Sequence, residues 1–587
     1  MASAARGGSV PKAPKEVTEQ SRLLSPAGGD RRYGRSLTIN DTGPRRQRSS
    51  VSSSMSRRSM RVTRSSWFLM LLTLSIGGLQ IAWSVELSNG SPYLLSLGIS
   101  KAMLALVWVA GPVSGALVQP YVGIRSDNCR IPWGKRKPFM IGGGIATIIS
   151  LLILGWTKEI CAFALPKGSP SLPTVTIWLA VTMIYVLDFS INTVQAGIRA
   201  FIVDNAPPHQ QDAANAWAGR MTGIGNVLGY LSGYVNLPEI LPWFGNTQFK
   251  VLCVIASVAL GGTLAVSCGF IMERDPNEDG PADEKKNNVL AFFGQVLHSA
   301  RRLPPQVRRV CDTQFFAWIG WFPFLFYSTT YIGEIYVQPH YAANPNLSKE
   351  EERKLWEEAT RVGTFALLIF AVVALTANTV LPIFIQPAFN PANADDSGAN
   401  SKHQRIVAFF RIPGLTLRRL WCFSHVIFAA SMWSTFFVKD TWGATALIAA
   451  CGIPWAVTLW APFALISADI SKRDAIKRGF LRSSVSTTGG IGEIGGEEDY
   501  VDQAGIILGL HNFAIAAPQV IATVMSSLIF KLLQKPRGST DDTSMAWVMR
   551  FGGLAAVLAA VMTVRLDEEV DEGLEFVDSD EDVEEEV

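Results

Sequence analysis

The stretch Val251-Leu-Cys-Val-Ile-Ala-Ser-Val-Ala-Leu-Gly-Gly-Thr-Leu-Ala-Val-Ser-Cys-Gly-Phe-Ile-Met272 has 22 residues and no charged side chain. An α-helix rises about 1.5 Å per residue, so a helix of this length crosses a hydrocarbon core of about 30 Å. Similar apolar runs recur along the chain, and helices are the expected spanning element because they satisfy their own backbone hydrogen bonds. The sequence therefore predicts an all-α polytopic membrane protein with 12 transmembrane helices, at residues 66–88, 99–122, 138–157, 173–199, 216–236, 250–272, 313–337, 362–386, 419–438, 442–467, 503–530 and 545–565.

The composition agrees with a membrane protein and excludes a soluble enzyme. Of the 587 residues, 48% are hydrophobic and 17% charged, whereas soluble proteins have roughly 25% charged residues. The net charge of +3 is a cancellation, because residues 1–65 carry fourteen Lys and Arg against four acids while residues 566–587 carry thirteen acids and no base. The net charge therefore gives no sign of a surface that binds nucleic acid. The seven cysteines lack CxxC or CxxH spacing, so we expect no metal site, and no cofactor is implied.

The charge distribution also predicts the topology. Residues 125–137, 274–309, 402–419 and 472–482 carry five, seven, five and five Lys or Arg, and such an excess marks the cytosolic side. An even number of spans then places both termini in the cytosol. The predicted segments are a disordered basic cytosolic tail (1–65), a six-helix half (66–272), a cytosolic central loop (273–312), a second six-helix half (313–565) and an acidic cytosolic tail (566–587).

Two local features interrupt this pattern. Residues 344–361 are predicted to form a short exposed surface helix, with Asn346-Leu-Ser348 resembling its cap. Prolines inside spans produce kinks that either serve gating or are static bends; they are Pro112, Pro323, Pro454, Pro462 and Pro518.

The fourth span carries a polar stripe. Asp188, Asn192, Gln195 and Arg199 are spaced by four, three and four residues, which places them on one helix face. Asp188 and Arg199 are roughly 16 Å apart along the axis and cannot pair directly. Because ionisable groups inside a membrane are costly, we interpret Asp188 as the proton-coupling carboxylate and Arg199 as an anchor for substrate oxygens. The alternative is a structural polar contact between helices.

Further polar groups lie in other spans. Gln80, Trp83 and Glu86 follow each other at three-residue spacing in the first span, and Glu334 follows an aromatic stretch in the seventh. Aromatic faces stack on sugar rings and polar neighbours bind hydroxyls, although most of these aromatics would equally serve packing. The predicted substrate-binding residues are Arg199, Asn192, Gln195, Gln80, Trp83, Glu86 and Glu334.

The loop between the second and third spans has a gating pattern. It combines Gly123, Asp127, Gly134 and a basic cluster that includes Arg136. Such a loop can latch the cytosolic face in one conformation, with its Asp paired to basic residues. Positive-inside topology alone explains the basic residues but neither the glycines nor the aspartate.

With these features the chain resembles the sucrose transporter family, in the glycoside–cation symporter branch of the major-facilitator fold. The resemblance rests on blocks in both halves, which include Trp83-Ser-Val-Glu-Leu-Ser88, Gly111-Pro-Val-Ser-Gly115, Leu187-Asp188, Arg199-Ala-Phe201, Gly225-Asn-Val-Leu-Gly-Tyr230, Trp321-Phe-Pro-Phe324 and Asn512-Phe-Ala-Ile-Ala-Ala-Pro-Gln519. It implies two rocking halves and proton symport of sucrose or a related α-glucoside, with Asp188 and Arg199 at the family's coupling and binding positions.

The chain departs from the plant pattern in ways that look more like fungal members. Plant members usually carry His where this chain has Lys101, and acids where it has Ser328 and Thr330. Fungal relatives include maltose-preferring carriers, so the resemblance leaves sucrose and maltose open as substrates.

The leading hypothesis is therefore a proton-coupled importer of a disaccharide, not an enzyme, driven by the proton gradient. The expected partners are the sugar, protons and membrane lipids, with no nucleic acid, and the chain is expected to be a monomer. The plasma membrane is favoured over the vacuolar membrane. An uncoupled sugar facilitator, a vacuolar proton-coupled exporter and a non-transporting sugar receptor remain as alternatives.

Overall fold

A computed structural model of the chain describes residues 63–566, except 167–168, 208–209, 274–293, 295–302, 345, 386–408, 478–480, 484–496, 537–538 and 540, together with residues 574–576. The described residues belong to one compact unit. The predicted tail over 1–65 lies outside the described residues except for its last three. Most of the predicted central loop (273–312) and of the acidic tail (566–587) lies outside them as well.

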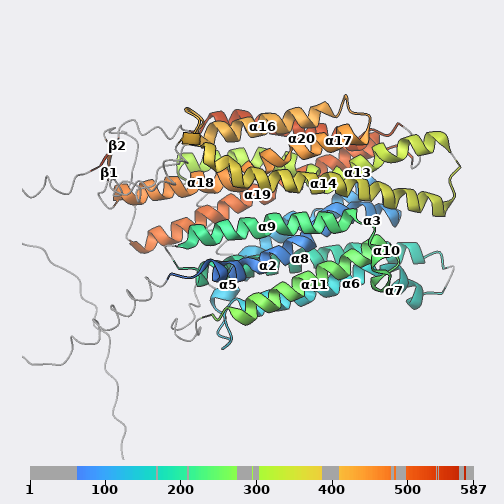
Figure 1. Cartoon of the computed structure of the whole chain (residues 1–587), viewed down its shortest axis with the longest axis horizontal. Helices are drawn as coiled ribbons and strands as arrows, with labels where there is room; N and C mark the ends of the chain where they lie inside the picture. The colour runs from blue at the N-terminus through green and yellow to red at the C-terminus, as the bar shows by residue number, and fades with distance from the viewer. Residues whose placement is uncertain are drawn as a thin grey trace, which may run out of the picture. The chain divides into compact units, whose positions relative to one another are not determined.

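The described chain is almost entirely helical, and a helix coincides with every predicted span (Figure 1). The one strand pair joins β1 (Leu481–Ser483) to β2 (Leu574–Phe576). The helices of the first half are α2 (Ser66–Val85), η1 (Glu86–Gly90), α3 (Ser91–Ser96), α4 (Lys101–Val107), α5 (Ala110–Asp127), α6 (Lys137–Gly155), α7 (Thr157–Ala164), α8 (Leu172–Asn205), α9 (Gln211–Tyr234), α10 (Leu237–Ile240), η3 (Pro242–Phe244) and α11 (Gln248–Phe270). Those of the second half are α13 (Pro305–Ala343), α14 (Lys349–Phe384), α16 (Leu417–Ser434), α17 (Thr441–Ala450), α18 (Gly452–Lys477), α19 (Glu497–Leu533) and α20 (Ser544–Val564).

Nine helical segments of the described residues are long and apolar enough to cross a membrane. The first of them joins α2, η1 and α3, the second α4 and α5, and a later one α17 and α18. The other three predicted spans correspond to α9, α13 and α16. These helices lie where the sequence predicts them and are long enough to span, but none contains a stretch as apolar and as poor in charge as those of the other nine. Of the three, α13 is the aromatic-rich helix.

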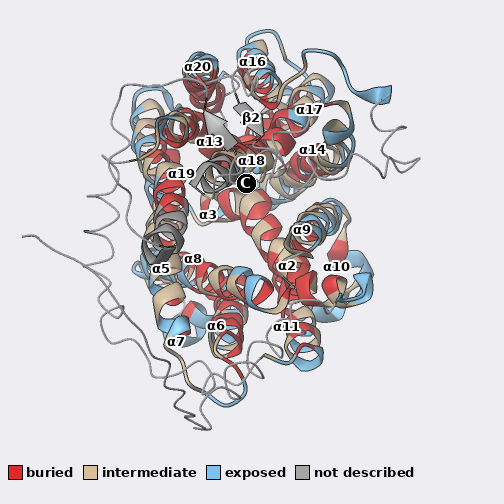
Figure 2. Cartoon of the chain, turned by 90° about the vertical axis from the view of Figure 1, so that its left-hand side faces the viewer, coloured by how far each residue is buried: buried red, intermediate tan, exposed pale blue. Residues whose placement is uncertain are grey.

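The helices form two groups that lie side by side (Figure 2). In the first group, α2 packs on α9 and α11, and α8 packs on α5 and α6. In the second group, α13 packs on α14, α19 and α20. The groups meet where α9 packs on α14 and where α19 packs on α4 and α5. The six-plus-six order of the spans is therefore also their spatial arrangement.

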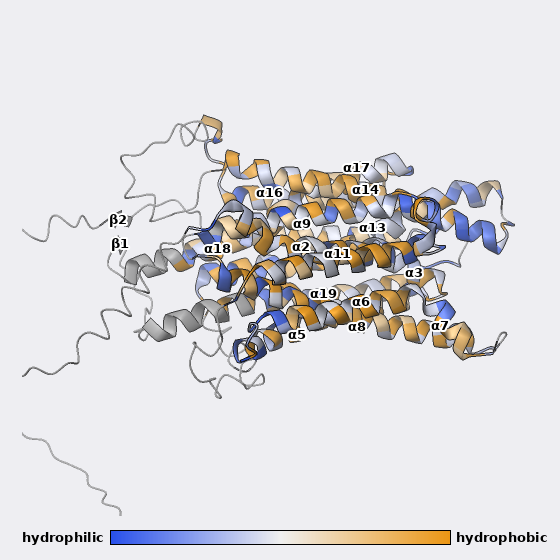
Figure 3. Ribbon diagram, turned by 60° about the horizontal axis from the view of Figure 1, so that its bottom comes forward, coloured by the Kyte–Doolittle hydropathy of each residue, from blue (hydrophilic) through white to orange (hydrophobic). Residues whose placement is uncertain are grey.

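The surface of the bundle is apolar along the helices and hydrophilic at their ends (Figure 3). Large apolar side chains such as Trp178, Val258 and Leu554 are exposed, whereas polar side chains such as Asp188 and Thr364 are buried. This is the reverse of a soluble protein and is what a lipid environment requires. The chain is an integral, multi-pass membrane protein. We call the end that holds Arg136 the Arg136 end and the opposite one, near α3 and α7, the Lys101 end.

Of the five prolines named above, two coincide with helix breaks. The helix stops between α4 and α5, just before Pro112, and again at Cys451, just before Pro454. A proline ring clashes with the carbonyl four residues earlier, which explains both positions. The other three, Pro323, Pro462 and Pro518, lie inside continuous helices.

The prediction of a short surface helix over 344–361 is wrong in length. The helix begins at Lys349, with Ser348 as its cap and Glu351 completing a capping box, as the sequence suggested. It then continues without a break to Phe384 as α14. The polar first turns and the apolar span are one helix, because no residue between them terminates it.

The contact between α2 and α9 depends on a glycine. A methyl group added at Gly225 would lie 2.5 Å from the carbonyl oxygen of Gly77 and 2.8 Å from Cβ of Gln80. Small residues allow membrane helices to approach in this way, and here the obstructing atom belongs to the backbone.

We expect Gly225→Ala to separate α2 from α9 and to destabilise the protein by about 1–3 kcal/mol, the usual effect of overpacking. Thermal unfolding of the purified protein in detergent measures the effect. Gly262→Ala is the matched control, because nothing lies within 4 Å of a methyl group at that position. Equal melting temperatures for the two variants would contradict this description of the contact.

Candidate functional site

The centre of the candidate site is the carboxyl group of Asp188 on α8. The residue is 0% exposed, and both of its oxygens are buried without a hydrogen-bond partner among the described residues. Glu86, at the start of the π-helical turn η1, is 2% exposed and equally without a partner. The two carboxyl groups are electrostatic neighbours. The structure thus brings together two acids that the sequence places on different helices.

The side-chain amide of Asn192, one turn after Asp188, forms hydrogen bonds with neighbouring protein groups. Its Nδ2 donates to Ser114 Oγ and to the backbone oxygen of Asp188, both at 2.9 Å, and its Oδ1 accepts from Gln119 Nε2 at 2.7 Å. These bonds tie α8 to α5. They favour a positioning role for Asn192 over direct substrate binding, because its amide has little capacity left.

The other predicted residues of the first span form pairs with α8 and α9. Trp83 Nε1 donates to Gln195 Oε1 at 3.2 Å, and Gln80 Nε2 donates to Asn226 Oδ1 at 2.9 Å. Trp83, Gln195 and Gln80 are half-buried. Each pair uses only one end of a glutamine amide, Oε1 of Gln195 and Nε2 of Gln80. The other ends can still form hydrogen bonds, so the face between α2, α8 and α9 is suited to bind hydroxyl groups.

Arg199 is separated from this cluster. It lies eleven residues beyond Asp188 on the same helix, about 16 Å along the axis, and its side chain is exposed. The predicted separation of the two charges is confirmed by the continuous helix α8.

Glu334 does not lie with the other predicted substrate-binding residues. Its carboxylate forms an ion pair with Lys101 of α4 at the Lys101 end. Lys101 Nζ also bonds Asp542 Oδ2 at 2.8 Å and Ser544 Oγ at 3.1 Å. This triad of Lys101, Glu334 and Asp542 joins the two helix groups, and Glu334 lies apart from the other predicted substrate-binding residues.

The third member of the triad, Asp542, precedes α20. Burial by itself raises the pKa of its carboxyl, but hydrogen bonds from Lys101 and Ser544 outweigh burial and lower the pKa below its ordinary value. The triad thus stabilises the charged form of Asp542. A cavity of about 860 Å³ lies beside the triad, and its walls include Tyr93, Phe249 and Trp356.

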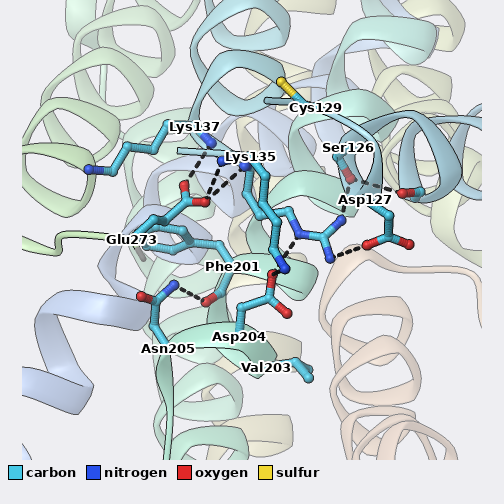
Figure 4. A network of polar contacts seen from close by, with 12 residues as sticks. Ser126, Asp127, Cys129, Lys135, Lys137, Phe201, Val203, Asp204, Asn205 and Glu273 are labelled. Carbon is cyan, nitrogen blue, oxygen red and sulfur yellow. Dashed lines mark hydrogen bonds and ion pairs between the residues drawn. The ribbon is translucent and has the colours of Figure 1, made fainter. Parts of the chain in front are cut away.

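At the opposite end, Arg136 organises the predicted gating loop through acids of α5 and α8; its partners Asp127 and Asp204 are labelled in Figure 4. Its guanidinium bonds Asp204 Oδ2 at 2.7 Å and also contacts Asp127 and Ser126. Burial opposes the charge, but the hydrogen bonds and charges of Asp204 and Asp127 raise the pKa of Arg136. The ends of α5 and α8 are thereby held to the start of α6.

The backbone of the same loop is held by Glu273, just after α11. Its carboxylate accepts from the amides of Lys135 at 2.8 Å, Arg136 at 3.0 Å and Lys137 at 2.9 Å (Figure 4). Gly134 has φ of 137°, and a methyl group there would lie 2.6 Å from the Glu273 carboxylate. Gly134 is required for two independent reasons, whereas nothing lies within 4 Å of a methyl group at Gly123.

Sequence reasoning missed Glu273, Asp542 and the role of Lys101. Glu273 is a lone acid that directly follows an apolar span, which is a weak signal. Lys101 and Asp542 are 441 residues apart, and no local pattern connects them.

With this geometry established, comparison with known proteins decides the family. Residues 68–377 match the Major Facilitator Superfamily. The chain belongs to that superfamily. A general alpha-glucoside permease of Schizosaccharomyces pombe is 37% identical over 550 residues, covering 85% of this chain and 93% of the permease. The sucrose transport protein SUT3 of Oryza sativa subsp. indica is 31% identical over 322 residues, covering 52% of this chain and 62% of that protein.

Solved major-facilitator structures share the fold at low sequence identity. A structure from work on substrate recognition in proton-dependent oligopeptide transporters superposes with a TM-score of 0.53 at 10% identity, covering 86% of this chain and 98% of that one. The inward-open xylose transporter XylE from E. coli gives 0.50 at 13% identity, with the same coverage. These likenesses establish the fold and nothing more specific.

For this major-facilitator chain we expect Gly134→Ala to displace Glu273 and loosen the loop, because the new methyl group meets the carboxylate and the positive φ is strained. Transport and thermal stability should both fall. Gly123→Ala, in the same motif, should leave both unchanged. Equal behaviour of the two alanine variants would show that Glu273 does not fix the loop.

The triad at the Lys101 end gives a second prediction. Lys101→Gln leaves two nearly buried carboxylates without their cation, and breaking a buried pair from one side costs about 3–5 kcal/mol. Hydrogen–deuterium exchange in α4 should accelerate strongly. Lys535→Gln breaks an exposed pair with Asp541 near the same end and should change exchange little, since exposed pairs contribute about 0–1 kcal/mol. Unchanged exchange in Lys101→Gln would show that the triad does not hold the two helix groups together.

Proposed function

We propose that the chain is a proton-coupled symporter that imports sucrose, maltose or a related α-glucoside. The relatives named as an alpha-glucoside permease and a sucrose transport protein support the substrate class. The observation that carries the coupling is Asp188, a fully buried carboxyl with no cation beside it among the described residues of a transporter fold. A structural carboxylate at such a depth would have a partner.

In this mechanism Asp188 exchanges a proton as the two helix groups alternate. Burial without a cation favours the protonated carboxyl, and access to water on the far side favours its release. The half-buried pairs Trp83–Gln195 and Gln80–Asn226 would bind sugar hydroxyls between α2, α8 and α9. Arg199 would hold a substrate oxygen or water toward the Arg136 end. Asn192 keeps α8 in register with α5, so that the Asp188 carboxyl stays in place.

The energy available is sufficient for uphill import. One proton provides about 2.3 kcal/mol per 100 mV of membrane potential and about 1.4 kcal/mol per pH unit. An uncoupled facilitator on the same fold would have no use for a buried acid. A vacuolar exporter would use the same residues in the opposite membrane orientation, and a receptor would bind sugar without moving it.

We further propose that the Arg136 end faces the cytosol and that both termini lie there. The basic loops support this orientation, because positive residues are retained on the cytosolic side. The plasma membrane is the location that suits an importer. We expect the monomer to be the transporting unit, since one chain supplies both helix groups.

We expect Asp188→Asn to abolish uphill sugar accumulation while exchange of labelled for unlabelled sugar persists. The amide keeps the shape of the carboxyl but cannot bind and release a proton. Reconstituted vesicles with simultaneous sugar and pH recording provide the measurement. Asp541→Asn, on an exposed loop, is the control and should behave like the native protein. Sugar-induced alkalinisation of native size in Asp188→Asn would refute the coupling role. Binding without transport in the native protein would identify a receptor.

A further inference from the structure

Glu86 is placed by an irregular turn of the first span. The α-helix α2 ends at Val85, and the next five residues, Glu86–Gly90, form the π-helical turn η1 before α3 begins. A π-turn adds a residue to the helical repeat and re-aims the side chains that follow. Such turns are less favourable than regular helix and recur at functional sites. The turn here begins on an acid that is almost completely buried.

Contacts around the turn hold it against both helix groups. Ser91 Oγ, one residue after the turn, donates to the backbone oxygen of Phe326 on α13 at 2.7 Å. The same hydroxyl accepts from Trp108 Nε1 at 3.0 Å, where the second span is broken. A methyl group at Gly90 would lie 2.7 Å from the Trp108 ring. Glu86 is thus fixed at a rigid junction and does not lie on a loose surface.

The electrostatic environment of Glu86 matches that of Asp188. All four carboxyl oxygens of these residues are buried, and among the described residues they have no hydrogen-bond partner outside the pair. Tyr185, one turn before Asp188, is a further electrostatic neighbour of the Asp188 carboxyl, but it is a phenol and supplies no positive charge. Two neighbouring buried carboxyls without a cation cannot both be ionised, because each charge would be desolvated and would repel the other.

We propose that Glu86 and Asp188 form a proton-sharing acid pair, and that the transported proton passes through both carboxyls. The proposal rests on the proposed symport and assigns to Glu86 a proton-carrying role in place of the predicted contact with sugar. The step is a single transfer: the protonated carboxyl of one residue gives its proton to the carboxylate of the other, and the charge moves in the opposite direction. No bond other than O–H is made or broken.

The pairing explains why neither acid has another partner. A structural acid would be held by amides or a cation, as Glu273 is held by three backbone N–H groups. A sugar-binding acid would line an accessible surface, as the half-buried Trp83, Gln195 and Gln80 do. Glu86 has neither kind of environment. Its location at the start of η1, beside Asp188 of α8, instead gives the proton a second position within one helix group.

Glu86→Gln tests the proposal, since the amide keeps the size of the side chain and cannot carry the proton. We expect proton-driven sugar accumulation to fall by about tenfold or more, the usual contribution of a proton-transfer group. Sugar exchange and the KM for sugar should stay within about twofold, because uniform binding is unchanged. Glu86→Asp, which keeps a titratable group, should retain part of the accumulation, and Glu239→Gln on the exposed surface of α10 is the matched control.

A spectroscopic measurement supplements the transport assay and does not depend on turnover. In purified reconstituted protein, sugar addition should change the infrared C=O band of a protonated carboxyl, and Glu86→Gln and Asp188→Asn should each remove or shift that band. Melting temperatures of the variants identify any loss of fold. If Glu86→Gln does not fold, the proposal is tested by the coupling and the infrared band of Glu86→Asp instead.

The outcomes separate this proposal from the proposed function. Native coupling in Glu86→Gln, together with loss of coupling in Asp188→Asn, would overturn the acid pair and leave Asp188 as the single proton site. A KM for sugar that rises about tenfold in Glu86→Gln at unchanged coupling would assign Glu86 to the sugar instead. Native coupling in Asp188→Asn would overturn the proposed function itself.

Discussion

The cost of placing a charge in a low-dielectric environment governs this molecule. An ionisable side chain at the centre of a bilayer costs about 2.5–3.5 kcal/mol on insertion scales, so each one requires compensation. Arg136 is compensated by Asp204 and Asp127, and Lys101 by Glu334 and Asp542. Asp188 and Glu86 have no such cation among the described residues, which distinguishes them from the charges that serve structure.

The compensated charges lie at opposite ends of the bundle and connect different parts. The Lys101 triad joins α4 of the first group to α13 and to the segment before α20 in the second. The Arg136 network connects α5, α6 and α8, all within the first group. One network therefore resists separation of the two groups, whereas the other makes one end of a single group rigid. Between them, the two groups contact through α9 with α14 and through α19 with α4 and α5.

Much of the fold could be predicted from sequence, because each helix that crosses a lipid bilayer needs a continuous apolar stretch of about 20 residues, which is visible in the sequence itself. Apolar length determined the spans, and the offsets from Asp188 to Arg199 determined the polar face of α8. Helix ends were harder to predict: Ser348 caps a helix as expected, but nothing in the sequence showed that this helix continues into the eighth span. The pairing of Lys101 with Asp542 and of Glu86 with Asp188 depends on tertiary contacts between distant segments. The π-turn that begins at Glu86 has no sequence signature at all.

Glu273 shows how a loop can be fixed without constraining its sequence. The carboxylate accepts hydrogen bonds from the backbone amides of residues 135–137. Every amino acid except proline supplies such an amide. The side chains at these three positions meet other demands: ion pairing with Asp204 at Lys135 and Arg136, and positive charge at Lys137. At positions 135 and 137 any residue except proline therefore preserves these backbone bonds, provided that position 134 stays glycine and position 273 stays acidic, whereas Arg136 is also required for its ion pairs with Asp127 and Asp204.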